Sequence, residues 1–194
     1  VLISALSDIE SSTTIGDKEV LELDFQGYVK DRVADAAQDP FSAFADPSMG
    51  LDQMLLAIKV AKEDSRVRGI SIRNPYFMGG FSQIHSIREA LSDFKTSGKK
   101  IFSYSDIYDQ KDYFLASVAD SVFLSPTGIL EFKGLSTEVL YLKDFQDKSG
   151  LKMEVIRHGK YKSAVEPYLA NEMSDAQKTQ LSELLGGIWN EIAV

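Results

Sequence analysis

Cysteine is absent from the 194 residues, and histidine occurs only as His85 and His158. The lack of cysteine excludes thiol catalysis, a disulfide framework and thiolate zinc sites. The two histidines are far apart in the chain, and neither lies in a cluster of acidic residues at ligand spacing. A histidine-based metal site or a Ser-His-Asp triad within this chain is therefore not expected. We predict no metal and no cofactor, and we interpret both histidines as surface or partly buried polar residues.

Basic residues and long apolar runs are also scarce. The 29 acidic and 21 basic residues give a net charge of −8, which argues against a nucleic-acid partner because binding a phosphate backbone needs a basic face. The chain contains no run of about 18 apolar residues that would predict a membrane span. The apolar opening, residues 1–6, is too short for a signal peptide and lacks its basic flank. A hydrophobic content of 44% is sufficient for a globular core.

Helical and strand patterns alternate along most of the chain. Residues 1–18 lack periodicity and predict a flexible arm, while 19–194 predict a single domain. Residues 30–50 form a long excursion that is a candidate subunit contact. Strands are predicted at 20–25, 69–72, 100–104, 121–124 and 153–156, and helices at 51–62, 84–94, 113–118, 137–148 and 174–192. Strands separated by helices predict βαβ units in an α/β fold with a mostly parallel sheet.

Local signals predict several element boundaries. Gly98 follows the second helix at the expected position of a C-cap. Pro126 and Gly128 are expected to end the fourth strand. Ser174 and Gln177 form a capping-box pattern at the start of the last helix, the most clearly patterned element of the chain.

The first segment that could carry chemistry is the predicted loop from Asn74 to Ser82. The pair Gly79-Gly80 lets the backbone turn sharply and expose N–H groups at a helix N-terminus. Such groups stabilise an oxyanion if a nucleophile lies beside them. A glycine pair in a strand-to-helix loop is usually only a turn, and a serine such as Ser82 more often caps or begins a helix than attacks a substrate.

The second segment is 158–168, which directly follows a predicted strand and contains Lys162. Most lysines are solvated, but small and apolar residues follow Lys162 and a glycine precedes it at the strand end. A lysine acts as a base only when it is neutral, and burial is what lowers a lysine pKa from its usual value of about 10.4. Glu166 is expected to form no more than a surface ion pair, and Pro167 fits a turn or the first turn of a helix.

The sequence from Gly159 to Tyr168 resembles the lysine motif of the signal peptide peptidase A (protease IV) family, peptidase family S49, most closely in its long, two-domain form. The resemblance extends over roughly residues 19–192. It includes the segments 69–70, 79–80, 91–99, 112–120, 124–128 and 135–138. It implies a ClpP/crotonase-like α/β fold of stacked βαβ units, with a serine nucleophile after a Gly-Gly loop.

The resemblance also implies a division of labour between two domains. The amino-terminal domain of the long form contributes the lysine base, here Lys162, with Ser163 as a candidate orienting residue. The carboxy-terminal domain contributes the serine from a Gly-Gly-Ser loop. In this chain Gly79 and Gly80 are followed by Phe81, so we expect a degenerate oxyanion-type loop without its nucleophile. Ser82 is one residue late, which turns its side chain by about 100° in a helix.

The leading hypothesis is therefore the amino-terminal half of a Ser/Lys-dyad endopeptidase that degrades cleaved signal peptides or envelope proteins and is inactive as the isolated chain. The implied partners are peptide substrates, the carboxy-terminal domain of the same protein, and further copies in a tetramer. The implied location is the extracytoplasmic side of the bacterial inner membrane, with a tether outside this chain.

Two other classes remain open. The first is a non-catalytic oligomerisation or peptide-binding module of the same fold, which a solvated Lys162 would favour. The second is an acyl-CoA enzyme of the hydratase type, which needs an acid/base carboxylate beside a pocket with basic residues for the CoA phosphates. Neither of those features is evident in the sequence.

Overall fold

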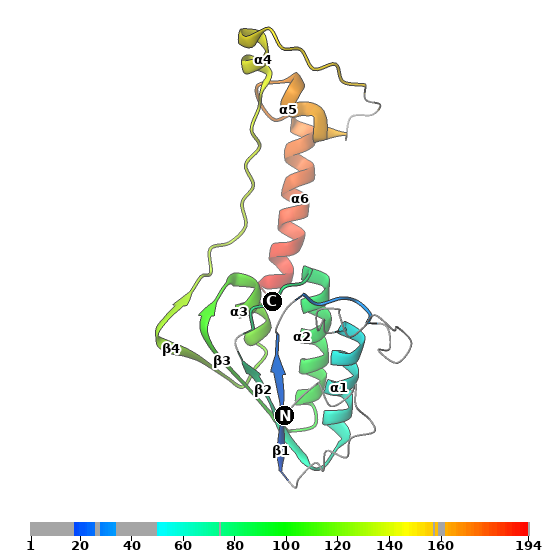
Figure 1. The fold of residues 1–194 in the computed structure, drawn as a ribbon, viewed down its shortest axis with the longest axis vertical. Helices are drawn as coiled ribbons and strands as arrows, with labels where there is room; N and C mark the ends of the chain where they lie inside the picture. Colours follow the sequence, from blue (N-terminus) through cyan, green and yellow to red (C-terminus); the bar gives the residue numbers. More distant parts are fainter. Residues whose placement is uncertain are drawn as a thin grey trace, which may run out of the picture. The chain divides into compact units, whose positions relative to one another are not determined.

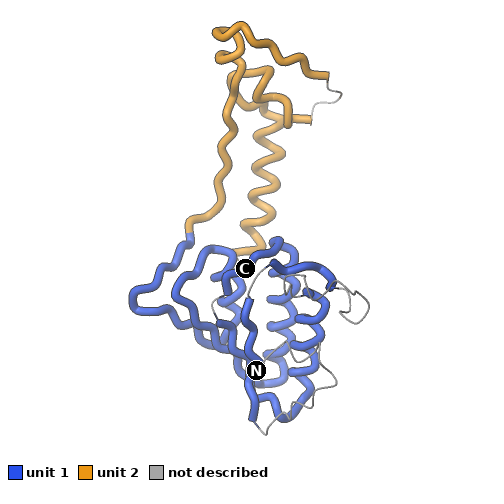
Figure 2. The backbone as a smooth tube through the Cα atoms, viewed as in Figure 1, with its two compact units in different colours: residues 1–132 blue, residues 133–194 orange. Residues whose placement is uncertain are grey.

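The computed structural model describes residues 18–25, 28–33, 50–73, 75–156, 158 and 162–193 (Figure 1). The chain divides into two compact units, residues 1–132 and 133–194 (Figure 2). Except for Lys18, the predicted arm lies outside the described residues. Residues 34–49, which make up most of the predicted excursion, also lie outside the described residues. The prediction of one domain over 19–194 stays a prediction.

The first unit is a four-stranded sheet with helices between successive strands. Its strands are β1 (Glu19–Asp24), β2 (Val67–Arg73), β3 (Lys100–Tyr108) and β4 (Ser121–Leu130), and its helices are α1 (Leu51–Glu63), α2 (Phe81–Lys95) and α3 (Gln110–Ala116). The strand order is β1-β2-β3-β4, and every neighbouring pair is parallel. When the connections between successive parallel strands all have the same handedness, this strand order places the connecting helices on one face of the sheet. Figure 1 shows this arrangement. The predicted α/β fold with a parallel sheet is confirmed.

The hydrophobic core of the first unit lies between the helices and one face of the sheet. Along β3 the side chains alternate, with Ile101 and Ser103 buried and Phe102 and Tyr104 exposed. The core side of α2 is formed by four apolar side chains that are fully buried, Ile84, Ile87, Leu91 and Phe94. Their spacing of three and four residues is that of a helix with one apolar face.

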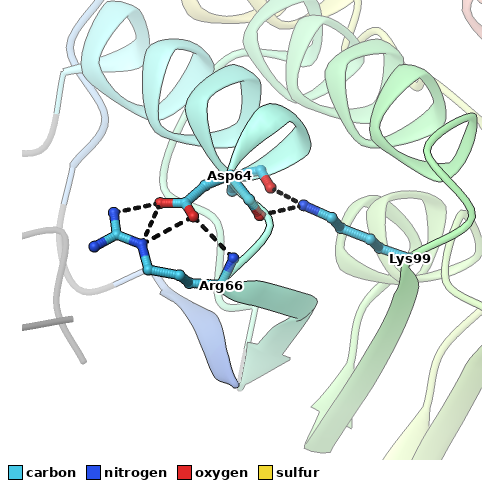
Figure 3. A network of polar contacts seen from close by, with 4 residues as sticks. Asp64, Arg66 and Lys99 are labelled. Carbon is cyan, nitrogen blue, oxygen red and sulfur yellow. Dashed lines mark hydrogen bonds and ion pairs between the residues drawn. The ribbon is translucent and has the colours of Figure 1, made fainter. Parts of the chain in front are cut away.

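Lys99 closes the carboxyl end of α1 (Figure 3). Its Nζ donates hydrogen bonds to the carbonyl oxygens of Ala61 at 2.7 Å and Asp64 at 2.6 Å. The carboxylate of Asp64 accepts from the backbone N–H of Arg66 at 2.9 Å and from its guanidinium at 2.7 Å. These bonds to Arg66 lower the pKa of Asp64 to about 2. Because a cation at a helix C-terminus satisfies free carbonyls and the helix dipole, Lys99 ties the residue before β3 to the end of α1.

Two predicted boundaries in the first unit are wrong. Helix α2 ends at Lys95 with Thr96 as its cap, and Gly98, at φ +80°, belongs to the turn that follows. Strand β4 continues through Pro126 and Gly128 to Leu130. Proline is tolerated there because β4 is an edge strand, and the register with β3 shifts between Ser105 and Ile107.

The second unit contains α4 (Lys143–Ser149), the 3-10 turn η4 (Ser163–Val165), α5 (Glu166–Leu169) and α6 (Asp175–Ile192). The helix predicted at 137–148 begins only at Lys143, and the strand predicted at 153–156 is wrong. Those four residues have no strand neighbour among the described residues, and Ile156 is fully exposed. The predicted cap of α6 is confirmed, since Ser174 Oγ accepts from the N–H of Gln177 at 3.2 Å. Among the helices of the described residues, none is both long and apolar enough to span a membrane.

The buried side chains of the second unit, as far as residues 133–194 are described, are all polar. They are Gln146, Glu166 and Gln177, with exposed fractions of 9%, 5% and 6%. Large apolar side chains are exposed instead, namely Leu135, Leu140, Phe145, Leu151, Met153, Ile156, Leu169 and Leu184. This part of the chain is organised by hydrogen bonds around polar groups, with its apolar surface left uncovered.

The two hydrogen bonds from Lys99 to the carboxyl end of α1 predict a specific effect on stability. Replacing Lys99 by alanine removes two charge-assisted hydrogen bonds, so Lys99→Ala is expected to lower the free energy of unfolding by about 1–2 kcal/mol. Lys59→Ala, on the exposed side of α1, is the matched control and should change it by less than about 0.5 kcal/mol. Urea denaturation of both variants measures the difference. Equal losses of stability in the two variants would show that Lys99 does not stabilise the end of α1.

Candidate active site: a glycine loop and a lysine turn

The Gly79-Gly80 loop joins β2 to α2, and its backbone is held by Gln83. Gly80 is the N-cap of α2, and its N–H donates to Oε1 of Gln83 at 2.8 Å. The amide of Gln83 donates in turn to the carbonyl of Val29 at 3.3 Å and to the carboxylate of Asp31. An oxyanion that used the Gly80 N–H would therefore have to displace a side chain of the same helix.

Only the first glycine of the pair, Gly79, has no room for a side chain. A Cβ on Gly79 would lie 2.5 Å from the ring of Phe77 and 2.6 Å from Oε1 of Gln83, whereas the nearest atom to a Cβ on Gly80 lies at 3.8 Å. The carbonyl of Gly79 accepts from Nζ of Lys111 at 3.2 Å. The loop is thus packed against Phe77 on one side and held by α3 on the other.

Phe81 stands directly after the glycine pair and is used for packing. Its ring stacks on Phe114 of α3, with centroids 5.3 Å apart and planes 25° from parallel. Ser82, the next residue of α2, is exposed. The side chain at the position where the resemblance places a nucleophile therefore holds α2 against α3.

Asp112, which sequence analysis missed, anchors the same loop from α3. Its side chain is 2% exposed, and Oδ1 accepts the backbone N–H of Phe77 at 3.0 Å. The pKa of Asp112 is raised to about 6, chiefly by burial. The hydrogen bond from Phe77 and the charge of Lys111 oppose this rise, and the negative charge of Asp109 adds to it. In the sequence Asp112 looks like an ordinary acidic residue in the first turn of a helix. Only its burial in the structure shows that it holds the loop.

Lys162 lies in the second unit, at the N-cap of the turn η4. Its backbone has φ −89° and ψ 69°, and its side chain is exposed in this chain. The neighbouring motif residues 159–161 lie outside the described part of the chain. Ser163, the candidate orienting residue, is half-buried, and its hydroxyl donates to Oε1 of Gln180 on α6 at 3.4 Å. The roles of Lys162 and Ser163 stay predictions.

Glu166 is not the surface residue that was predicted. The side chain is 5% exposed, and Oε1 accepts from the hydroxyl of Ser174 at 2.8 Å while Oε2 accepts from the Ser174 N–H at 3.4 Å. The prediction was wrong because nothing in the local sequence indicates that the start of α6 folds back over this carboxylate. Pro167 lies in the first turn of α5, as predicted.

The described residues contain no group of three or more histidine, aspartate or glutamate side chains that could hold a metal ion. The glycine loop belongs to the first unit and the lysine turn to the second, and each is built within its own unit.

The two glycines are expected to respond differently to a methyl group. Gly79→Ala forces Cβ against the buried ring of Phe77, so the free energy of unfolding should fall by about 1–3 kcal/mol, as in other overpacked sites. Gly80→Ala makes only ordinary van der Waals contact, with the nearest atom at 3.8 Å, and should cost about 0.5 kcal/mol. Thermal and urea unfolding of this chain compare the two, and a larger effect at Gly80 would contradict the geometry.

Asp112 should make stability depend on pH in a predictable direction. Its folded-state pKa of about 6 lies above the ordinary value of 3.8, so the folded protein binds the proton more tightly than the unfolded chain, and stability falls as pH rises from about 4 to about 6. Asp112→Asn removes this penalty, so the variant should gain roughly 1–3 kcal/mol relative to the wild type on going from pH 4 to pH 7. Urea denaturation across that range tests it. Asp106→Asn, at an exposed position of β3, is the control, and an Asp112→Asn difference that is the same at pH 4 and pH 7 would refute the assignment.

Comparisons with known proteins agree with the resemblance. The profile of peptidase family S49 matches residues 93–193 of the 194. Protease 4 of Haemophilus influenzae is 34% identical over 196 residues, covering 97% of this chain and 32% of that protein. Protease 4 of Salmonella typhi is 34% identical over 178 residues (87% and 29%), and the chloroplastic serine protease SPPA of Arabidopsis thaliana is 26% identical over 162 residues (84% and 23%). The chain spans about a third or less of the length of these curated relatives. Since the family profile covers more than half of its residues, the chain belongs to peptidase family S49.

Proposed function

We propose that this chain is the lysine-donating amino-terminal domain of a Ser/Lys-dyad endopeptidase, whose serine comes from a carboxy-terminal domain beyond these residues. The observation that carries the proposal is the state of the glycine loop. Phe81, packed on Phe114, stands where the family's serine is expected, while the lysine motif around Lys162 is intact in the sequence. A domain that keeps the base and has lost the nucleophile needs a second domain to complete the reaction.

In the proposed reaction, neutral Lys162 accepts the proton of the partner serine as its Oγ attacks the scissile carbonyl. The amine then returns this proton to the leaving nitrogen, and water hydrolyses the acyl-enzyme in the second half of the cycle. The oxyanion is held by backbone N–H groups beside the serine, in the carboxy-terminal domain, because the Gly80 N–H of this chain is already bonded to Gln83.

As a base, Lys162 requires a shared site. A lysine works as a base near neutral pH only when it is removed from water, and in this chain its side chain is exposed. The covering surface must therefore come from outside the described residues. The uncovered apolar side chains of the second unit, such as Leu140, Phe145 and Ile156, point to the same requirement.

The proposed partners follow from that requirement and from the family. They are the carboxy-terminal domain of the same protein and further copies in a tetramer. The chain accounts for 32% of the Haemophilus protein, a share that leaves room for a second domain. The proposed substrates are cleaved signal peptides or envelope proteins. The proposed location is the extracytoplasmic side of the bacterial inner membrane, with the tether outside this chain.

A non-catalytic module of the same fold is the second candidate. Two observations favour it: Lys162 is exposed, and the Gly80 N–H is engaged by Gln83. In that case the uncovered apolar side chains would serve only to bind peptides or other subunits. The two candidates differ in what the loss of Lys162 does to the complete protein.

The decisive experiment assays the full-length gene product and this chain side by side on a quenched signal-peptide substrate. Lys162→Ala should lower the kcat of the full-length protein by at least about 1000-fold, the usual effect of removing a general base from a dyad or triad. Lys152→Ala, at an exposed position of the same unit, should leave it unchanged, and the isolated chain should be inactive.

Three outcomes would count against the proposal. If the full-length protein cleaved normally with Lys162→Ala, the lysine would have no role as a base. If the isolated chain cleaved and Ser82→Ala abolished cleavage, the nucleophile would lie in this chain. If no substrate were cleaved by any form, the non-catalytic module would be favoured.

A further inference from the structure

The start of α6 and the lysine turn are joined through one buried carboxylate. Ser174 is the N-cap of α6, and its hydroxyl makes two bonds: it accepts from the N–H of Gln177 at 3.2 Å and donates to Oε1 of Glu166 at 2.8 Å. The N–H of Ser174 also reaches Oε2 at 3.4 Å. Glu166 therefore receives both polar hydrogens of the residue that caps an 18-residue helix.

This arrangement is stronger than a surface contact between two polar residues. A buried carboxylate is costly unless it is hydrogen-bonded, and Glu166 is only 5% exposed. The amino end of a helix offers free N–H groups and a partial positive charge, which favour an anion at that position. Bonds to ionised acceptors are stronger than bonds between neutral groups.

Further hydrogen bonds hold α5 and the start of α6 to the segment 141–146. Oε1 of Gln177 accepts from the hydroxyl of Tyr141 at 2.8 Å, and Nε2 of Gln146 donates to the carbonyl of Tyr168 at 2.9 Å. The N–H of Leu142 donates to the carbonyl of Pro167 at 2.7 Å. Leu142 and Gln146 thus hold α5, while Tyr141 bonds to Gln177 in the first turn of α6.

Lys162 lies four residues before Glu166, at the N-cap of the turn that leads into α5. A general base functions only within hydrogen-bond reach of the proton it takes, and an error of about 1 Å in such a position lowers the rate about 100-fold. The side chain of Lys162 is exposed in this chain, so no packing among the described residues holds it. The backbone of the turn therefore sets where this side chain starts, and a covering domain meets the amine in the right place only if that start is fixed.

We propose that Glu166 is a positioning residue for Lys162: its bonds to Ser174 fix the turn 162–166 on the amino end of α6. This inference rests on the proposed role of Lys162 as the general base. Glu166 itself does not touch substrate. Its effect reaches the reaction through the lysine alone, and that separates it from a residue that only stabilises the fold.

The test uses the full-length enzyme and a signal-peptide substrate, with kcat and KM measured well below the melting temperature of each variant. Glu166→Ala and Ser174→Ala should each lower kcat by about 10- to 100-fold while KM changes by less than about threefold. Glu166→Gln, whose amide oxygen still accepts from the Ser174 hydroxyl, should recover most of the rate. Glu183→Ala, at an exposed position of α6, is the control and should equal the wild type. Ser174→Ala keeps the carboxylate and serves as the second variant if Glu166→Ala does not fold.

The double variant Lys162→Ala/Glu166→Ala distinguishes positioning from general stability. If Glu166 acts through the lysine, the double variant is no slower than Lys162→Ala alone. An additive loss, an unchanged kcat for Glu166→Ala, or no recovery in Glu166→Gln would each overturn the inference. Lys162→Ala alone distinguishes failure of the proposed function from failure of this inference. If Lys162→Ala is fully active, the proposed function fails. If Lys162→Ala is inactive while Glu166→Ala is fully active, only the positioning role of Glu166 fails.

Discussion

One-sided burial of the parallel sheet is the constraint on which the first unit depends. Four apolar residues of α2 pack with no exposed area against the sheet, and burying side chains of this size contributes roughly 1.5–3 kcal/mol each. This packing fixes where α2 begins, and therefore where Gly79 and Gly80 turn the chain. Asp112 and Lys111 then attach the loop to α3 through Phe77 and the Gly79 carbonyl. These two hydrogen bonds hold the loop above the packed core of the first unit.

The second unit is organised in the opposite way. Its described buried side chains are polar, and the Glu166–Ser174 pair links the lysine turn to α6 by hydrogen bonds rather than by apolar packing. Hydrogen bonds are directional, so they define the geometry of a turn, but they contribute modestly to stability in water. A surface with such a turn and many uncovered apolar side chains is suited to being completed by another part of an assembly. This physical difference between the units fits a site that is shared between domains.

Predictions from sequence were correct where the interactions join residues close together in the chain, and wrong where they join distant ones. The α2 stripe and the Ser174 cap of α6 were predicted correctly because both depend on residues three or four positions apart. The end of β4 was predicted wrongly because proline is excluded from central strands but allowed at an edge, and the edge position is a property of the sheet. Residues 153–156 have the composition of a strand but no neighbour to pair with among the described residues. Asp112 and Glu166 were missed or misassigned because their burial comes from contacts 35 and 8 residues away.

The sequence by itself determined the α/β class and the family resemblance. It also predicted a glycine loop without a nucleophile, because Phe81 after two glycines cannot attack a carbonyl whatever the fold. Lys162 stays a predicted base, identified through a motif of contiguous residues. Only the tertiary structure decided that the Gly80 N–H is bonded to Gln83, that Asp112 is buried with a raised pKa, and that Glu166 binds the amino end of α6. These last features arise from groups that meet in space, and desolvation and hydrogen bonding depend on that meeting rather than on the order of residues along the chain.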